Sequence, residues 1–248
     1  MKATEEKRAW MSDQEQPALA RVMAIYAHPD DPEFFSGGTL IKWGLEGKEL
    51  TYVLATSGDK GTDDPTMTGP RLIEIREAEQ RAAAKHAGAE KLIFLRYADG
   101  ELEPTLTLRR ALTRLIRQHK PDIVVTNDPT MRWSANGGIN HADHRAIGDA
   151  TLDAVYPSAR DRFTFVELWR DEGLEPHKVR HVYLSGTLDS NAKVDITPVF
   201  EKKLHAIYEH KSQVKDVEGL TKRMRDGHDP AFADGKTCTE SFRVLTLR

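Results

Sequence analysis

Two short stretches of the sequence concentrate side chains that bind metal ions or transfer protons. They read AHPDD and NHADHR, and they contain His28, Asp30, Asp31, His141, Asp143 and His144. Zinc at a catalytic site takes three protein ligands, for which imidazole nitrogen and carboxylate oxygen are both suitable, and leaves one position for water. His28 and Asp31 are three residues apart at the end of an apolar run, so both can converge on one ion. His141 and His144 have the spacing of one helical turn, which lets one bind the ion while the other faces a substrate.

Asp30 is adjacent to Asp31 and should project in a different direction, which would place its carboxylate beside the attacking water. Two neutral histidines, one aspartate and a divalent ion carry a net charge of about +1, and such a site lowers the pKa of water toward about 7. A simpler interpretation is open, because Asp31 followed by Pro32 is typical of a helix N-cap with proline in the first turn. The second cluster favours the metal site over an N-cap alone.

The elements that must position these clusters alternate between apolar runs and amphipathic helices. The sequence predicts strands at 22–27, 49–56, 90–97, 122–127, 179–186 and 240–247, and helices at 39–45, 71–89, 105–120, 144–156 and 199–213. This alternation implies an α/β fold with a mainly parallel sheet and helices on both faces. In such sheets, ligands bind outside the carboxyl ends of the strands. Both clusters are expected at that edge, because one follows the first strand and the other lies a loop beyond the fourth.

Length, charge and cysteine content narrow the function classes. The 248 residues suffice for one large domain, which we expect at 19–248, with residues 1–18 as a mobile or peripheral segment. A net charge of −3 without a basic stripe makes nucleic acid a poor partner, and no apolar run is long enough for a membrane span. The N-terminus lacks the apolar region of a secretory signal, and the single cysteine, Cys238, cannot form an internal disulfide. These features predict a cytoplasmic enzyme or binding protein.

Four segments between Arg21 and Gln213 carry motifs of one known family. AHPDDPEFFSGGTL resembles the AHPDDxE signature of the PIG-L/LmbE-like N-acetylglucosaminyl deacetylases, and NHADHRAIGDA looks like the HPDHR segment of that family. RLIEIREAEQRAAAKHAGAEKLIFLRYADGEL is similar to the stretch between those motifs, and VFEKKLHAIYEHKSQ is similar to a late helix with an H-x-SQ ending. The first two motifs are specific in combination, whereas the other two are weak alone. The resemblance implies a Rossmann-like fold and zinc-dependent hydrolysis of an acetamide on an amino sugar.

The resemblance also implies a role for each matching residue. His28, Asp31 and His144 would bind the metal, which would be zinc or ferrous iron. Asp30 would be the general base that takes a proton from the attacking water. After the amide breaks, protonated Asp30 or His141 could supply the proton that the leaving amine needs.

Five further positions complete the comparison. His141, as imidazolium, would stabilise the oxyanion, and Asp143 would orient it or pair with its charge. Arg76 matches an arginine that contacts substrate, although its default on a helix rich in Glu and Arg is a surface ion pair. Ala142 replaces the proline usual in the family, which frees the backbone dihedral beside His141. Trp133 lies in a loop before the second cluster and could stack on a sugar face, or simply pack.

These residues lead to a hypothesis and its alternatives. The leading function is a zinc-dependent deacetylase of an N-acetylglucosamine-type conjugate, with a small molecule as partner. The alternatives are an amidase of the same mechanism that acts on a thiol conjugate or another small amide, and a non-catalytic sugar-binding relative. A phosphoesterase with paired metals is disfavoured, because the sequence offers one compact set of ligands. Homo-oligomerisation is left open by the sequence.

Overall fold

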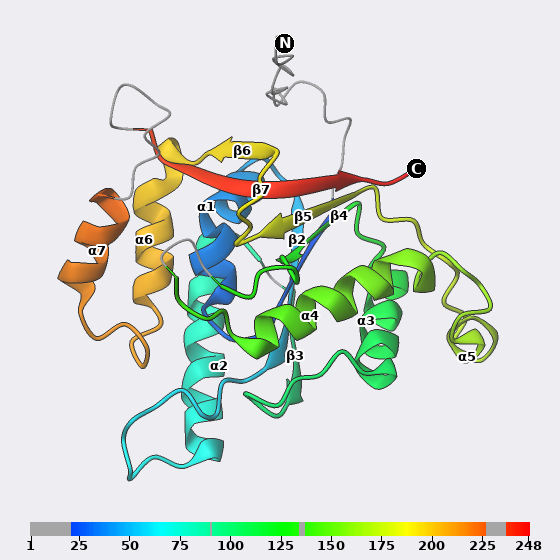
Figure 1. The fold of residues 1–248 in the computed structure, drawn as a ribbon, viewed down its shortest axis with the longest axis horizontal. Coiled ribbons are helices and arrows are strands. Elements are labelled where there is room, and N and C mark those ends of the chain that lie inside the picture. The colour runs from blue at the N-terminus through cyan, green and yellow to red at the C-terminus, as the bar shows by residue number, and fades with distance from the viewer. Residues whose placement is uncertain (1–20, 90, 134–136, 227–236) are drawn as a thin grey trace.

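Seven strands form one sheet within the residues that the computed structural model describes, which are 21–89, 91–133, 137–226 and 237–248 (Figure 1). The strands are β1 (Arg21–Tyr26), β2 (Glu49–Thr56), β3 (Lys91–Tyr97), β4 (Ile123–Asn127), β5 (His181–Ser185), β6 (Ala192–Asp195) and β7 (Thr239–Thr246). Their order across the sheet is β3-β2-β1-β4-β5-β7-β6. The first five strands pair in parallel, whereas β7 runs antiparallel to both β5 and β6. The sheet is therefore mainly parallel, as the sequence predicts.

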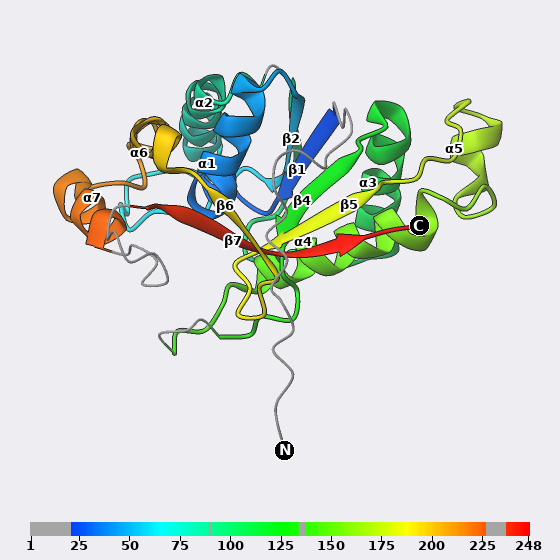
Figure 2. The same cartoon turned by 90° about the horizontal axis from the view of Figure 1, so that it is seen from above.

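Helices cover both faces of this sheet (Figure 2). One face carries α1 (Asp31–Leu45), α2 (Gly69–His86) and α6 (Phe200–Tyr208), and the other carries α3 (Leu106–His119) and α4 (Ala142–Asp153). Two short helices, α5 (Val166–Arg170) and α7 (Val217–Asp226), lie at the periphery. None of the helices in the described ranges is both long and apolar enough to cross a membrane. The predicted peripheral segment at 1–18 lies outside the described residues.

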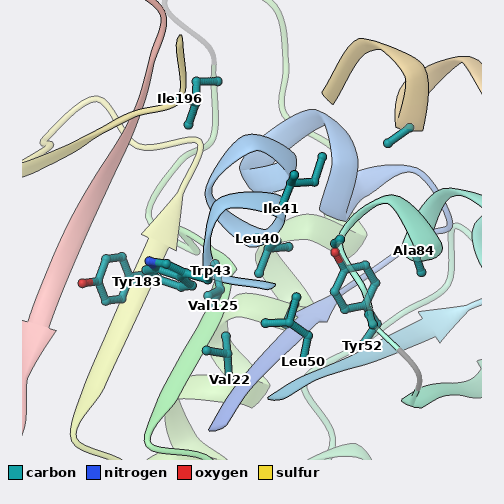
Figure 3. Packing of buried hydrophobic residues seen from close by; sticks show 14 of the residues in the cluster. Val22, Leu40, Ile41, Trp43, Leu50, Tyr52, Ala84, Val125, Tyr183 and Ile196 are labelled. Carbon is teal, nitrogen blue, oxygen red and sulfur yellow. The ribbon is translucent and has the colours of Figure 1, made fainter. Parts of the chain in front are cut away.

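Strand β1 supplies two separate cores, because successive side chains of a strand point to opposite faces. Val22 and Tyr26 join the core beneath α1, α2 and α6, whereas Met23 joins the core beneath α3 and α4. Figure 3 shows the first of these cores, in which Trp43 meets Tyr183 edge to face with ring centroids 5.2 Å apart. Burial on both faces explains why this strand reads as a continuous apolar run.

The direction in which strands are added reverses beside β1. From β1 the chain moves outward through β2 and β3, and it then returns to place β4 on the other side of β1. Such a switch point leaves a crevice outside the carboxyl ends of the two neighbouring strands, where ligands bind in open α/β sheets. The polar clusters follow these same two strands, so the topology alone brings them together.

Helix α1 begins eight residues earlier than the predicted helix at 39–45. Its start is fixed by Pro32 in the first turn and by the Asp30 carbonyl, which accepts the N–H groups of Glu33 and Phe34 at 3.0 Å each. The glycine pair before position 39 lowers the helix propensity of this stretch, so the first half of α1 was not predicted from the sequence. Close packing requires glycine there, because a Cβ on Gly38 would lie 2.7 Å from the Ile196 side chain.

Other boundaries differ because of tertiary contacts. The predicted helix at 199–213 ends at Tyr208, where the chain tightens and the His210 N–H bonds to the Ile207 carbonyl. The predicted helix at 144–156 begins at Ala142 and stays regular only to Asp153. Strand β6 and helices α5 and α7 have no counterpart among the elements predicted from the sequence. Strand β6 has four residues and exists because it pairs with β7.

Candidate active site

The two polar clusters lie together at the switch point. His28 follows β1 and Asp31 is the first residue of α1, while His141 caps α4 and His144 lies in its first turn. The ring centroid of His28 lies 4.7 Å from that of His141 and 5.3 Å from that of His144. A third strand reaches the same place, because Asp99 follows β3 and contacts His28.

The Asp31 carboxylate lies between two imidazole rings. Its Oδ2 is 3.4 Å from His28 Nδ1, and its Oδ1 is 3.1 Å from His144 Nε2. Ligand atoms of the three residues all lie within 4.8 Å of one another, so they could hold one metal ion. Burial alone would raise the pKa of Asp31, but His144 and His28 outweigh burial and hold that pKa well below its usual range. Asp31 is therefore ionised, which is the form that binds a cation.

The other ring nitrogen of His28 faces two further carboxylates. His28 Nε2 is 3.0 Å from Asp99 Oδ1 and 3.2 Å from Asp143 Oδ2. Burial disfavours charge on His28, but hydrogen bonds with Asp143, Asp31 and Asp99 outweigh it and raise the pKa of His28 to about 12. Carboxylates that bond one ring nitrogen fix the orientation of a ligating histidine. The arrangement thus leaves Nδ1 as the atom of His28 that suits a metal.

A second group of possible ligands comprises His28, His141 and Asp143, whose atoms also lie within 4.8 Å of one another. This group is less suited, because the Asp143 carboxylate already accepts the N–H groups of Gly100 at 2.8 Å and Leu102 at 3.2 Å. His141 Nδ1 is also engaged, since it accepts the Asp143 N–H at 3.1 Å as the cap of α4. The Asp143 carboxylate is nearer to His28 than to His141, from which it lies 3.9 Å away.

Asp30 lies beside the histidines with an unusual backbone. Its φ of +95° is rare for a residue other than glycine. Its N–H donates to Gln80 Oε1 at 2.9 Å, and its Oδ2 accepts from Arg76 Nη2 at 3.1 Å. Burial raises the pKa of Asp30, Arg76 lowers it and Asp31 raises it, with a net rise to about 6. A carboxylate with this pKa can accept a proton near neutral pH.

Arg76 is buried and uses its guanidinium on groups of the protein. Nη2 donates to the Pro29 carbonyl at 2.6 Å, and Nη1 donates to the Gly58 carbonyl at 3.1 Å, in addition to the contact with Asp30. Gly58 has φ +68°, and a Cβ there would lie 2.1 Å from Arg76 Nη1, so this approach requires glycine. The surface ion pair considered from the sequence is not the arrangement found, and a contact between Arg76 and substrate stays a prediction.

Trp133 and His141 are the most exposed of the predicted site residues. Trp133 is 64% exposed and forms a β-bridge with Ile139, which places it on the loop that leads into α4. Burial and the charge on His28 lower the pKa of His141. A sugar contact by Trp133 stays a prediction.

Asp99 was not predicted as a site residue, although its position in the sequence could have indicated it. Asp99 is the second residue after β3, so it stands at the same edge of the sheet as His28. Burial raises the pKa of Asp99, but the His28 contact and the Lys60 N–H, which donates at 3.0 Å, lower it to about 2. Asn140 was also missed, and its Oδ1 lies 3.2 Å from His144 Nδ1. That contact directs Nε2 of His144 toward Asp31.

Comparison with known proteins identifies relatives over most of the chain. The family described as PIG-L, GlcNAc-PI de-N-acetylase, matches residues 23–155. Diacetylchitobiose deacetylase of Thermococcus kodakarensis is 34% identical over 195 residues, which cover 79% of this chain and 70% of the relative. A probable N-acetyl-alpha-D-glucosaminyl L-malate deacetylase 2 of Bacillus anthracis is 28% identical, covering 83% of this chain and 87% of the relative. The solved structure of N,N'-diacetylchitobiose deacetylase from Pyrococcus horikoshii superposes with a TM-score of 0.81 at 31% identity, covering 92% of this chain and 84% of that chain.

Proposed function

The chain belongs to the PIG-L family, and from this membership we propose that it is a zinc-dependent N-deacetylase. The proposed reaction adds water across the acetamide of an N-acetylglucosamine-type conjugate, which releases acetate and leaves a free amine on the sugar. The relatives named above support this substrate class, because their names describe deacetylases of N-acetylated amino sugars. The LmbE-like fold seen in the Pyrococcus horikoshii structure supports it as well.

We assign His28, Asp31 and His144 as the residues that would hold the metal. Two imidazole nitrogens and one carboxylate oxygen fit zinc, which keeps a fourth position open at catalytic sites. The same set of ligands also suits ferrous iron, so elemental analysis must identify the native ion. When bound, the ion would supply a Lewis acid that polarises the amide carbonyl and makes water more acidic.

The chain's own residues would then handle the protons. Asp30 takes a proton from the attacking water, and the same proton can pass from Asp30 to the leaving nitrogen as the amide breaks. The imidazolium expected for His141 is disfavoured, because His141 Nδ1 accepts the Asp143 N–H and because burial and the charge on His28 lower the pKa of His141. The neutral ring would instead donate a hydrogen bond from its Nε2–H to the oxygen that becomes negative in the tetrahedral intermediate. Asp143 would act mainly by holding the ring of His28, because that contact is its shorter one. His141 could also supply the final proton.

One observation carries the proposal. Asp30 precedes Asp31 in the chain, yet its carboxylate accepts a hydrogen bond from Arg76 and belongs to neither group of possible metal ligands. A deacetylase needs a Lewis acid and a base at the same carbonyl, and this arrangement separates a site for the first from a candidate for the second. A protein that only binds sugar has no need of a separate base.

Trp133 is the residue that we propose for recognition of the sugar. Trp133 stands exposed on the loop before α4, where an aromatic ring could stack on the apolar face of a sugar. A cytoplasmic location also stays a prediction from the single cysteine.

The test is acetate release from a panel of N-acetylated compounds. The panel would include N-acetylglucosamine, diacetylchitobiose, N-acetylglucosaminyl conjugates of inositol and malate, and an N-acetyl thiol conjugate that carries no sugar. We expect acetate from at least one amino sugar, loss of activity after chelation and recovery on addition of zinc. Release from the thiol conjugate alone would favour the amidase alternative, and metal binding without any turnover would favour a sugar-binding relative.

A further inference from the structure

A chain of buried hydrogen bonds runs from His210 to the backbone of Asp30. His210 Nε2 lies 3.1 Å from Glu33 Oε2, Gln80 Nε2 donates to Glu33 Oε1 at 3.0 Å, and the Asp30 N–H donates to Gln80 Oε1 at 2.9 Å. His210 and Gln80 are 0% exposed, and Glu33 is 2% exposed. The three side chains come from the turn after α6, from α2 and from α1. None of them belongs to the proposed ligand set or touches the reacting groups directly.

The donor and acceptor groups available determine how each side chain of this hydrogen-bond chain is oriented. An ionised carboxylate only accepts hydrogen bonds, so Glu33 requires the amide NH₂ of Gln80 to face it. The same amide must then turn its oxygen toward the Asp30 N–H, which needs an acceptor. The charge on Glu33 therefore decides which end of Gln80 reaches Asp30.

His210 is one of the hydrogen-bond partners of the buried Glu33 carboxylate. A buried carboxylate without a partner is strongly disfavoured, and a paired and hydrogen-bonded one is tolerated. His210 Nε2 supplies a second donor to Glu33 Oε2, the oxygen to which Gln80 Nε2 also donates at 3.1 Å. Removal of His210 would take away one of the donors that hold the Glu33 carboxylate in place, so that Glu33 no longer fixes the position of the Gln80 amide.

The hydrogen-bond chain ends at Asp30, whose backbone conformation is energetically unfavourable. Asp30 adopts φ +95°, and backbone conformations of this kind persist only where the surroundings hold them. Arg76 holds the carboxylate of Asp30 and the preceding carbonyl, which leaves the N–H of Asp30 to Gln80. The N–H contact and the Arg76 contacts together determine where the Asp30 carboxylate points.

We propose that His210, Glu33 and Gln80 are positioning residues, which hold Asp30 in the backbone conformation that presents its carboxylate to the reacting centre. The inference rests on the proposed function in one respect, because it takes Asp30 as the general base. It also explains the histidine and the shape of the turn in the H-x-SQ segment, where α6 stops at Tyr208 and the chain brings His210 inward. None of these three residues would be a catalytic residue in the sense of touching substrate.

Lys203, on the helix α6 that precedes His210, offers a matched control. Lys203 Nζ lies 2.6 Å from Glu240 Oε1, and this buried pair binds two other N–H groups of α1, those of Gly38 and Thr39, at 2.8 Å each. The control pair therefore resembles the His210 and Glu33 pair in burial, in charge and in linking α6 to α1. It differs in its contacts with α1, which are the Phe34 carbonyl, to which Lys203 Nζ donates at 3.1 Å, and the N–H groups of Gly38 and Thr39, rather than Asp30.

The experiment compares His210→Leu, His210→Gln and Gln80→Met with the control Lys203→Met. We expect His210→Leu and Gln80→Met to lower kcat about 10- to 100-fold with KM and metal content unchanged, because a displacement of about 1 Å at a reacting group has effects of this size. His210→Gln should recover most of the loss, since its amide nitrogen can donate to Glu33. Lys203→Met should lower the melting temperature by a similar amount and leave kcat near that of the wild type.

Amide hydrogen exchange supplies a second readout that needs no substrate. Exchange at the Asp30 N–H should accelerate in His210→Leu and in Gln80→Met, whereas exchange at Gly38 and Thr39 should accelerate in Lys203→Met. Wild-type kcat together with wild-type exchange at Asp30 in His210→Leu would overturn the inference, as would an equal loss of kcat in Lys203→Met. If His210→Leu does not fold, Gln80→Met decides. If the wild type releases acetate from no compound, the proposed function fails, while the exchange pattern still tests the positioning of Asp30.

Discussion

Asp31 and His144 face each other at 3.1 Å, although one begins α1 and the other lies on α4, on the opposite side of the sheet. This contact exists only because β1 and β4 are neighbours at the switch point. The same Asp31 carboxylate reaches His28 with its other oxygen. A single side chain thus joins the two sequence clusters.

Metal binding should depend on each of these three residues. His28→Ala, Asp31→Ala and His144→Ala each remove one of three ligands, so we expect metal content after dialysis to fall from one ion per chain to a small fraction. Elemental analysis measures this, with His205→Ala as a control because His205 is exposed on α6. A variant lacking two of the three residues that still retains one ion per chain would rule the assignment out.

Asp30→Asn should separate metal binding from turnover. The change nearly keeps the size of the side chain but removes the proton acceptor, and loss of a general base typically costs about 10² to 10⁴ in rate. We therefore expect normal metal content, a normal fold and a kcat reduced by that factor. Asp63→Asn serves as a control at an exposed position. Near-normal turnover in Asp30→Asn with its metal bound would move the base elsewhere, with His141 tested first.

Arg76→Ala should distinguish a positioning role from a substrate contact. The structure ties Arg76 to Asp30 and to two carbonyl groups, so we expect kcat to fall because Asp30 loses its partner. A substrate contact of equal strength in the ground and transition states would instead raise KM and leave kcat unchanged. Steady-state kinetics over a range of substrate concentrations gives the answer. A rise in KM alone would restore the role that the family resemblance implies.

The stability of the protein should depend on pH through His210. Burial disfavours charge on His210, but the hydrogen bond with Glu33 and the charges of Glu33, Asp30 and Glu79 outweigh it and raise its pKa. The folded state therefore holds this proton more tightly than the unfolded state, whose histidine pKa is about 6.5. The resulting stabilisation is complete below about pH 6.5 and is lost as pH rises through the folded pKa, with a limiting slope of about 1.4 kcal/mol per pH unit.

Urea unfolding of wild type and His210→Gln between about pH 5.5 and 9 measures this contribution, because glutamine does not titrate. The difference in the free energy of unfolding should favour the wild type at low pH and shrink as pH rises. A difference that stays constant over this range would show that His210 does not carry the proton in the folded state. The Lys203→Met variant provides a comparison in which the titration of His210 is unchanged.

The sequence was most informative where local pattern and topology act together. Strands β1, β2, β4 and β5 were predicted from stretches rich in apolar residues, which follow from near-complete burial within a parallel sheet. Strand β3 was also predicted, although it lies at the edge of the sheet and is only partly buried. The meeting of His28 with His144 was predicted because both follow strands at one edge. These inferences need only the order of elements and the rule for where ligands bind in such sheets.

What the sequence did not reveal depends on contacts between distant residues. Asp99 contacts His28, and Gln80 contacts both Glu33 and Asp30, yet none of these pairs has a local pattern. The burial of Arg76 depends on Gly58, which belongs to another loop. Strand β6 has no signal of its own, because its ladder is completed only by β7. Side chains chosen for tertiary contacts leave no periodic trace in the sequence.

The position of the site at the switch point has a consequence for folding as well as for catalysis. An ion held by His28 and His144 would connect two parts of the chain that are separated by β2, α2, β3 and α3. Such a connection closes a long loop, and closing a long loop restricts the unfolded chain more than closing a short one. The ion would then act as a reversible cross-link between the two halves of the sheet. It would stabilise the folded state in addition to serving catalysis.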